Sequence, residues 1–210
     1  MNKFRRSASY TKETALLLAL VLGVAPCAAV EGQSGGFKWS WGTTLTYGLG
    51  TRLLDPDKRL IGVAAGGTAF SVNGDDGNQN CKTGLFTNAG KVTSELEFSY
   101  NKKFGGFVRG FAFYDHTNEK GDRERTPLSD EAKKRVGKRA EIRDAFLWYR
   151  FTIGSQPGEI RAGAQVINWG ESTFLQGGIN AVNPLDVSTL RVPGSELRDA
   201  LLPVGAVRLN

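Results

Sequence analysis

Few residue combinations in this sequence have the types and spacing that enzyme or metal chemistry needs. The stretch Gly170 to Phe174 has the outline of a nucleophile elbow, but it ends in phenylalanine where that motif has glycine. His116 is the only histidine, which leaves little material for a zinc site or a histidine-dependent triad. The stretch Asn73 to Asn80 carries oxygen ligands without the acidic spacing of a calcium loop, so we interpret it as a glycine-rich turn. We therefore expect no enzyme, no metal and no cofactor.

Charged residues that alternate with apolar ones are the more informative pattern. The run FKWSWGTTLTYGLGTRL, Phe37 to Leu53, places aromatic and aliphatic residues mainly at odd positions and polar residues or glycine at even ones. A period of two predicts a strand with one apolar and one polar face. The run is much longer than the mean strand of about five or six residues in soluble proteins.

Four further strand-like runs follow, namely Val92 to Tyr100, Phe107 to Asp115, Glu141 to Phe151 and Glu159 to Trp169. The connections after the five strands are long, short, long, short and long. Polar segments at 55–91 and 116–140 form the first two long ones, and 101–106 and 152–158 form the short ones. Within 116–140, Ser129 is expected to cap a short helical turn over 129–135.

The first 29 residues are interpreted as a secretory signal peptide. A basic head is followed by the apolar run Ala15 to Ala25 and by small residues before a cleavage site after Ala29. An uncleaved anchor and a lipoprotein processed at Cys27 are the alternatives. Removing residues 1–29 lowers the net charge from +6 to +3, because four basic residues and Glu13 are lost. The exported chain, 30–210, therefore gives little reason to expect a nucleic-acid partner.

Two all-β architectures fit these runs. A soluble antiparallel sandwich would bury the apolar faces in a core. An outer-membrane β-barrel would turn them toward lipid, with short periplasmic turns, longer external loops and aromatic residues at the interfaces. The alternation of long and short connections and the length of the strands favour the barrel, with Phe37, Trp39 and Trp41 at its periplasmic rim.

In the barrel model a set of ionisable or polar side chains would face the lumen. This set comprises Lys38, Arg52, Glu95, Glu97, Arg109, Asp144, Arg150, Arg161 and Gln165. Rings of charged side chains select the solutes that pass a water-filled pore. The alternative is that these residues pair across strands and only hold the wall together.

The segment from Gly170 onward would leave the fifth strand on the external side. It could fold inward and narrow the pore, and the candidate constriction residues are Trp169, Glu171, Asn183, Asp186 and Arg191, with Glu196, Arg198 and Asp199 nearby. Alternatively, Val187 to Val192 is a sixth strand.

Several landmarks resemble a large porin-like outer-membrane family of proteobacteria that is catalogued as a domain of unknown function. They are DDGNQN (Asp75 to Asn80), SELEFSY (Ser94 to Tyr100), FGGFVRGFAFYD (Phe104 to Asp115), VINWGES (Val166 to Ser172) and INAVNPLD (Ile179 to Asp186). The resemblance implies a membrane barrel and no particular substrate. Because about five strands cannot close a barrel, we expect an N-terminal fragment of one or the product of a truncated reading frame, with assembly from several chains as the alternative.

The expected function is a porin-like channel or facilitator for small solutes in the outer membrane. A non-conducting surface binding or structural protein is the alternative. The expected partners are outer-membrane lipid, the barrel-assembly machinery and small solutes.

Overall fold

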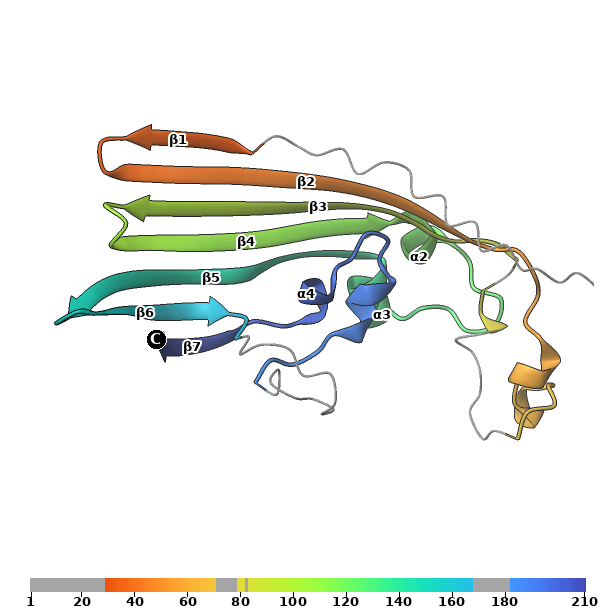
Figure 1. Cartoon of the computed structure of the whole chain (residues 1–210). Helices are drawn as coiled ribbons and strands as arrows, with labels where there is room; N and C mark the ends of the chain where they lie inside the picture. The colour runs from red at the N-terminus through yellow and green to blue at the C-terminus, as the bar shows by residue number, and fades with distance from the viewer. Residues whose placement is uncertain (1–28, 71–78, 82, 168–181) are drawn as a thin grey trace, which may run out of the picture.

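A single antiparallel sheet of seven strands dominates the computed structural model, which describes residues 29–70, 79–81, 83–167 and 182–210 (Figure 1). The strands neighbour one another in the order of the sequence, with β1 and β7 at the edges. They are β1 (Val30–Ser34), β2 (Phe37–Arg52), β3 (Gly84–Tyr100), β4 (Phe104–Asp115), β5 (Lys138–Ile153), β6 (Gln156–Gln165) and β7 (Val204–Leu209). The prediction of an all-β antiparallel fold is confirmed, and the sheet is not closed.

Short links lie at one end of the sheet and long connections lie at the other (Figure 1). The short links are 35–36, 101–103 and 154–155, and the long connections are 53–83, 116–137 and 166–203. The long connections carry η1 (Lys58–Leu60), η2 (Val63–Ala65), α2 (His116–Lys120), α3 (Asp130–Val136), η4 (Val187–Arg191) and α4 (Leu197–Ala200). The predicted alternation of short and long connections is therefore confirmed. Among the described residues, no helix has the length and apolar character to cross a membrane.

Local chemistry explains the tight links. Gly35 and Gly154 adopt positive φ angles of 55° and 62° in the first and third links, and Asn101 and Lys102 do so in the second, at 49° and 57°. Two consecutive residues with positive φ are typical of a type I′ turn, whose backbone twist matches that of the two strands of a hairpin. The second link is shorter than the predicted 101–106, because Gly105 and Gly106 belong to β4.

The helical turn predicted in the second long connection is confirmed. The Ser129 side chain accepts a hydrogen bond from the Ala132 amide at 3.2 Å, and α3 runs to Val136. Asp130 and Glu131 lie in its first turn and three basic residues lie in its last, as the helix dipole favours.

Several predicted strand limits were wrong. β1 was missed because VEGQS carries no apolar alternation, and it forms by pairing with the first residues of β2. β3 begins at Gly84 rather than Val92, because β2 is long enough to pair with the whole of it. β6 ends at Gln165, and Trp169 lies outside the described residues.

The predicted sixth strand at Val187 to Val192 was also wrong. Residues Val187–Arg191 form the 3₁₀ helix η4, whose first turn is capped by Asp186 accepting from the Ser188 amide at 3.1 Å. The strand that follows β6 is β7, whose residues 204–209 pair with 160–165. An aspartate before the run and Pro193 after it favour a capped turn over a strand.

The two faces of the sheet differ sharply in chemistry. We call the face that carries the odd positions of β2 the apolar face, and the opposite one the polar face. Fixed register aligns the apolar face across the sheet, for example through the row Trp41, Leu96, Val108 and Ala145. Its large apolar side chains are exposed from β2 to β7, with Leu45 53%, Leu96 40%, Ile142 72% and Val207 77% exposed.

Aromatic residues mark both borders of the apolar face. At the end of the short links one register row contains Phe37, Tyr100, Phe104 and Tyr149. Toward the long connections, Tyr47 and Tyr114 flank Gly90 in another row. Aliphatic and small residues occupy most of the space between the two rows.

Candidate functional site

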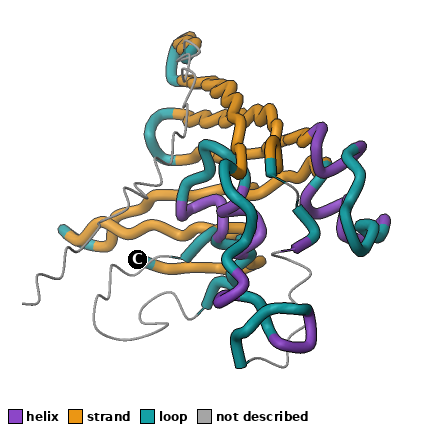
Figure 2. Tube along the Cα trace, turned by 90° about the vertical axis from the view of Figure 1, so that its right-hand side faces the viewer, coloured by secondary structure: helices purple, strands orange, loops and turns teal. Residues whose placement is uncertain are grey.

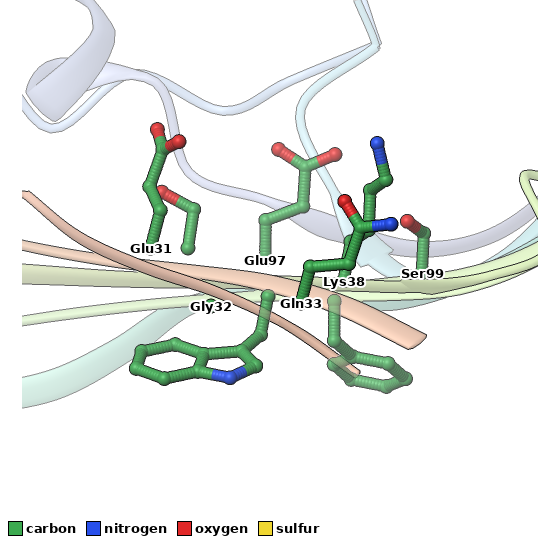
Figure 3. A pocket seen from close by; sticks show the side chains of 9 residues that line it. Glu31, Gly32, Gln33, Lys38, Glu97 and Ser99 are labelled. Carbon is green, nitrogen blue, oxygen red and sulfur yellow. The ribbon is translucent and has the colours of Figure 1, made fainter. Parts of the chain in front are cut away.

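The polar face gathers ionisable side chains from every strand. Near the short links, Glu31 and Gln33 of β1, Lys38 of β2, and Glu97 and Ser99 of β3 line a hollow of about 370 Å³. Figure 3 shows these side chains on one side of the strands and aromatic rings on the other; Trp39 and Phe98 are the aromatic residues of the lining. The β1 contribution was missed by sequence reasoning along with the strand itself.

Most of the predicted lumen-facing residues lie on this face. Register places Lys38 opposite Ser99, Glu97 opposite Phe107, Glu95 opposite Arg109 and Arg161 opposite Arg208. Asp144, Arg150 and Gln165 share the face through their pairs or contacts with Arg109, Glu159 and Ala206. Arg52 does not join them, because it lies at the loop end of β2 and donates to the Cys81 carbonyl at 2.9 Å.

Residues 182–203 fold back over the polar face, and we call them the covering segment (Figure 2). The segment is closed on itself, because the Asp186 amide donates to the Ala200 carbonyl and the Leu202 amide donates to the Pro184 carbonyl, both at 2.8 Å. η4 and α4 therefore form one small unit. The segment therefore lies over the polar face and does not form a further strand at Val187 to Val192.

Several ion pairs join the covering segment to the strands beneath it. Lys91 Nζ lies 2.6 Å from Asp199 Oδ2, and Arg139 Nη1 lies 2.6 Å from Asp186 Oδ2. Arg198 Nη2 lies 2.9 Å from Glu95 Oε1 in a more exposed position. The first two pairs are almost fully buried, so each depends on its partner for compensation of the charge.

Asp199 is the centre of a larger cluster. Its second oxygen lies 3.7 Å from Arg109 Nη1, while Arg109 Nε lies 2.8 Å from Asp144 Oδ2. Asp144 also accepts a hydrogen bond from the Val166 amide at 3.3 Å. Sequence reasoning singled out Arg109 and Asp144 but missed Lys91, because it lies in a stretch interpreted as polar loop.

A bulge in β5 brings an unpredicted arginine to the same cluster. Val108 pairs with Ala145 and Gly110 pairs with Ile142, so Arg143 and Asp144 together face Arg109. A bulge of this kind can turn two consecutive side chains to one side of a sheet. The Arg143 guanidinium lies 4.8 Å from the centre of the Phe111 ring, and its Nε lies 3.4 Å from Glu141 Oε2.

The predicted constriction residues have different environments. Asn183 is buried, accepts from the Ile167 amide at 3.0 Å and donates to the Leu202 carbonyl at 2.9 Å, so it anchors both ends of the covering segment. Asp186 contacts Arg139 on the polar face. Arg191 is exposed and faces the long connections instead. Trp169 and Glu171 lie outside the described residues. The same holds for Gly170 to Phe174, most of Asn73 to Asn80 and residues 1–28 of the predicted signal peptide.

Aromatic rings stacked with arginines complete the polar face toward the short links. Phe107 and Phe146 lie 5.5 Å apart between ring centres. Arg161 lies over the Phe146 ring at 4.5 Å, and Arg150 lies over Trp148 at 4.2 Å. Sequence reasoning did not single out these rings, although even spacing from Asp144 through Phe146 and Trp148 to Arg150 was the available signal.

The two buried aspartates of the covering segment are held ionised. Burial would raise the pKa of Asp186, but hydrogen bonds from Ser188 and Arg139 outweigh it and hold the pKa well below its ordinary value. Burial likewise opposes ionisation of Asp199, yet hydrogen bonds from Lys91 and the Glu196 amide lower its pKa. Both carboxylates therefore keep their cationic partners at neutral pH.

Acid is expected to release the covering segment only below the ordinary aspartate range. A carboxyl with a lowered pKa in the folded state contributes stability above its unfolded pKa, about 3.9, and loses it as pH falls toward the folded value. A nitroxide attached at position 190 should therefore keep its mobility from pH 7 to about pH 4 and gain mobility below that. A nitroxide at Ser155, in the last short link, is the control. Release between pH 7 and pH 5 would contradict this assignment.

Close packing against Gly48 provides a second test of the covering segment. A Cβ atom on Gly48 would lie 2.1 Å from the Pro193 Cβ, whereas one on Gly42, on the same face of the same strand, would meet nothing within 4 Å. Gly48→Val should thus displace the segment and lower the free energy of unfolding by about 1–3 kcal/mol. Gly42→Val should cost much less in the same urea titration, and equal losses would show that the segment does not rest on Gly48.

No group of three or more histidine, cysteine, aspartate and glutamate residues is arranged to hold a metal ion in the described part of the chain. The geometry defines an antiparallel meander with one exposed apolar face and one polar face that residues 182–203 cover in part. The chain belongs to the family described as "Protein of unknown function (DUF1302)", whose model matches residues 11–210. No curated protein and no solved structure matches the chain significantly.

Proposed function

We propose that the sheet is part of the wall of an outer-membrane β-barrel that acts as a channel or facilitator for small solutes. The exposed apolar face is the observation that carries this proposal. A sheet in water would have to leave that face, from Leu45 to Val207, in contact with solvent, whereas lipid would cover it.

The spacing of the aromatic rows supports lipid as the covering medium. Phe37 and Tyr47 are about ten residues apart on β2, which corresponds to about 34 Å along a strand at about 3.4 Å per residue. A strand tilt of about 40° reduces this to about 26 Å, close to the height of the apolar band of outer-membrane barrels. The short links would then face the periplasm, and the long connections would face outward.

Pairing of the sheet edges is a requirement of the proposal. β1 and β7 each present one side without a neighbouring strand in the described residues. Unpaired backbone groups in lipid cost several kcal/mol each, so both edges must pair with further strands in the membrane. The polar face would then line the lumen, and the covering segment would lie within it as a constriction.

Conductance in planar bilayers tests the proposal. Full-length protein should give discrete channel openings, and the double variant Asp186→Asn and Asp199→Asn should give larger ones because it loosens the constriction. Absence of conductance in both proteins would overturn the proposal that the protein acts as a channel.

A non-conducting surface protein is the second candidate. The covering segment favours it, because buried ion pairs hold this segment against the polar face. That candidate predicts a silent wild-type protein, with the double variant silent as well.

A further inference from the structure

A second cavity lies among the long connections, away from the charged cluster on the polar face. Its volume is about 790 Å³, within the range of about 300–1,000 Å³ typical of small-molecule sites. The first residues of β3, the connection that carries α2 and α3, and the end of η4 contribute to it. Five apolar side chains contribute to its wall: Phe86, Leu128, Ala132, Val136 and Val192.

The carboxylate of the one acidic residue in this wall, Asp115, is occupied by hydrogen bonds within the protein. Asp115 is 4% exposed, and its carboxylate accepts from the Thr87 hydroxyl and the Asn118 side-chain amide at 2.5 Å each. It also accepts from the backbone amides of Asn88 and Asn118 at 3.2 and 3.1 Å. Asp115 therefore fixes the start of α2 against β3 and offers no free acceptor to a ligand.

The two basic residues of the wall have no carboxylate partner among the described residues. Arg123 donates to the Asn118 side chain, and its Nη1 lies 3.5 Å from Cys81 Sγ. Its Nε is buried without a hydrogen-bond partner, which leaves a charged donor unsatisfied. Arg191, which is exposed, adds a second positive charge to the wall.

We propose that this cavity binds a small amphipathic monocarboxylate. Its carboxylate would pair with the guanidinium groups of Arg123 and Arg191, because neither group has a carboxylate partner among the described residues. The apolar body would lie against the five apolar side chains. The Asp115 carboxylate already accepts four hydrogen bonds, and the wall carries two positive charges against this one negative charge, which favours an anion over a neutral or cationic ligand. The proposal does not depend on whether the protein conducts.

Calorimetric titration of the full-length protein in lipid nanodiscs tests the site, with 4-phenylbutanoate as the probe and 4-phenylbutanamide as its neutral match. Wild-type protein should bind the acid about tenfold or more tightly than the amide, because only the acid offers a charged acceptor. Arg123→Gln should weaken binding of the acid by a similar factor. Arg135→Gln on the exposed side of α3 is the matched control and should bind like wild type.

A second variant separates loss of the site from loss of folding. Ala132→Trp keeps Arg123 but fills the cavity, so it should abolish binding while the far-ultraviolet circular dichroism remains that of wild type. Equal affinity for acid and amide, full affinity in Arg123→Gln or Ala132→Trp, or no binding by wild type at millimolar concentrations would each overturn the proposal.

Discussion

Asp199→Ala is expected to lower the free energy of unfolding by about 3–5 kcal/mol in urea titrations of the protein in phospholipid vesicles. The substitution leaves Lys91, whose side chain is 7% exposed, without its carboxylate 2.6 Å away. It also removes the second anion near Arg109, at 3.7 Å. A buried charge that loses its partner retains its desolvation cost, so this loss exceeds that of a surface pair.

Two further variants make this result interpretable. Asp122→Ala removes an aspartate from an exposed position in the second long connection and should change the free energy of unfolding by no more than about 0.5 kcal/mol. The double variant Lys91→Met with Asp199→Leu removes both charges and should recover most of the loss. If Asp199→Ala behaves like Asp122→Ala, the covering segment is not held by this pair.

Leu96→Arg is expected to cost about 2–4 kcal/mol of stability in lipid vesicles and to reduce the amount of protein assembled in the outer membrane. Leu96 is 40% exposed and lies about midway between the two aromatic rows, where an arginine would meet the centre of the bilayer. Its direct neighbours across the strands are Trp41 and Val108, neither of which offers an arginine a carboxylate partner.

Glu97→Arg provides the matched control for this experiment. It introduces the same side chain one residue further along β3 on the polar face, where Glu97 lines an open hollow. Its cost should stay within about 0.5 kcal/mol. Equal costs for the two arginines, or a tolerated arginine at position 96, would show that the apolar face does not meet lipid.

The order of strands and connections was predictable because each rests on local pattern. Apolar and polar residues alternate so regularly from Phe37 to Leu53 that the pattern predicts one strand with two chemically different faces. Ser129 before an acidic first turn likewise identified α3. By contrast, β1 has no pattern of its own, since VEGQS becomes a strand only by pairing with β2.

The charged cluster was predictable only in part, because its pairs join distant segments. Arg109 and Asp144 follow from strand parity, which needs only the local alternation. Arg143 violates parity because the bulge turns it to the polar face. The pair between Lys91 and Asp199 joins residues more than 100 positions apart, and no local pattern specifies such a contact.

Lipid is expected to cover the apolar face of the sheet. Spin labels at Leu45 and Leu96, and at Thr44 and Glu97 on the opposite face, would test it most directly in cysteine-free protein reconstituted in lipid vesicles. Labels at 45 and 96 should collide mainly with oxygen, which concentrates in lipid, and labels at 44 and 97 mainly with a water-soluble nickel chelate. Access of the nickel chelate to all four labels, or to none, would contradict the claim.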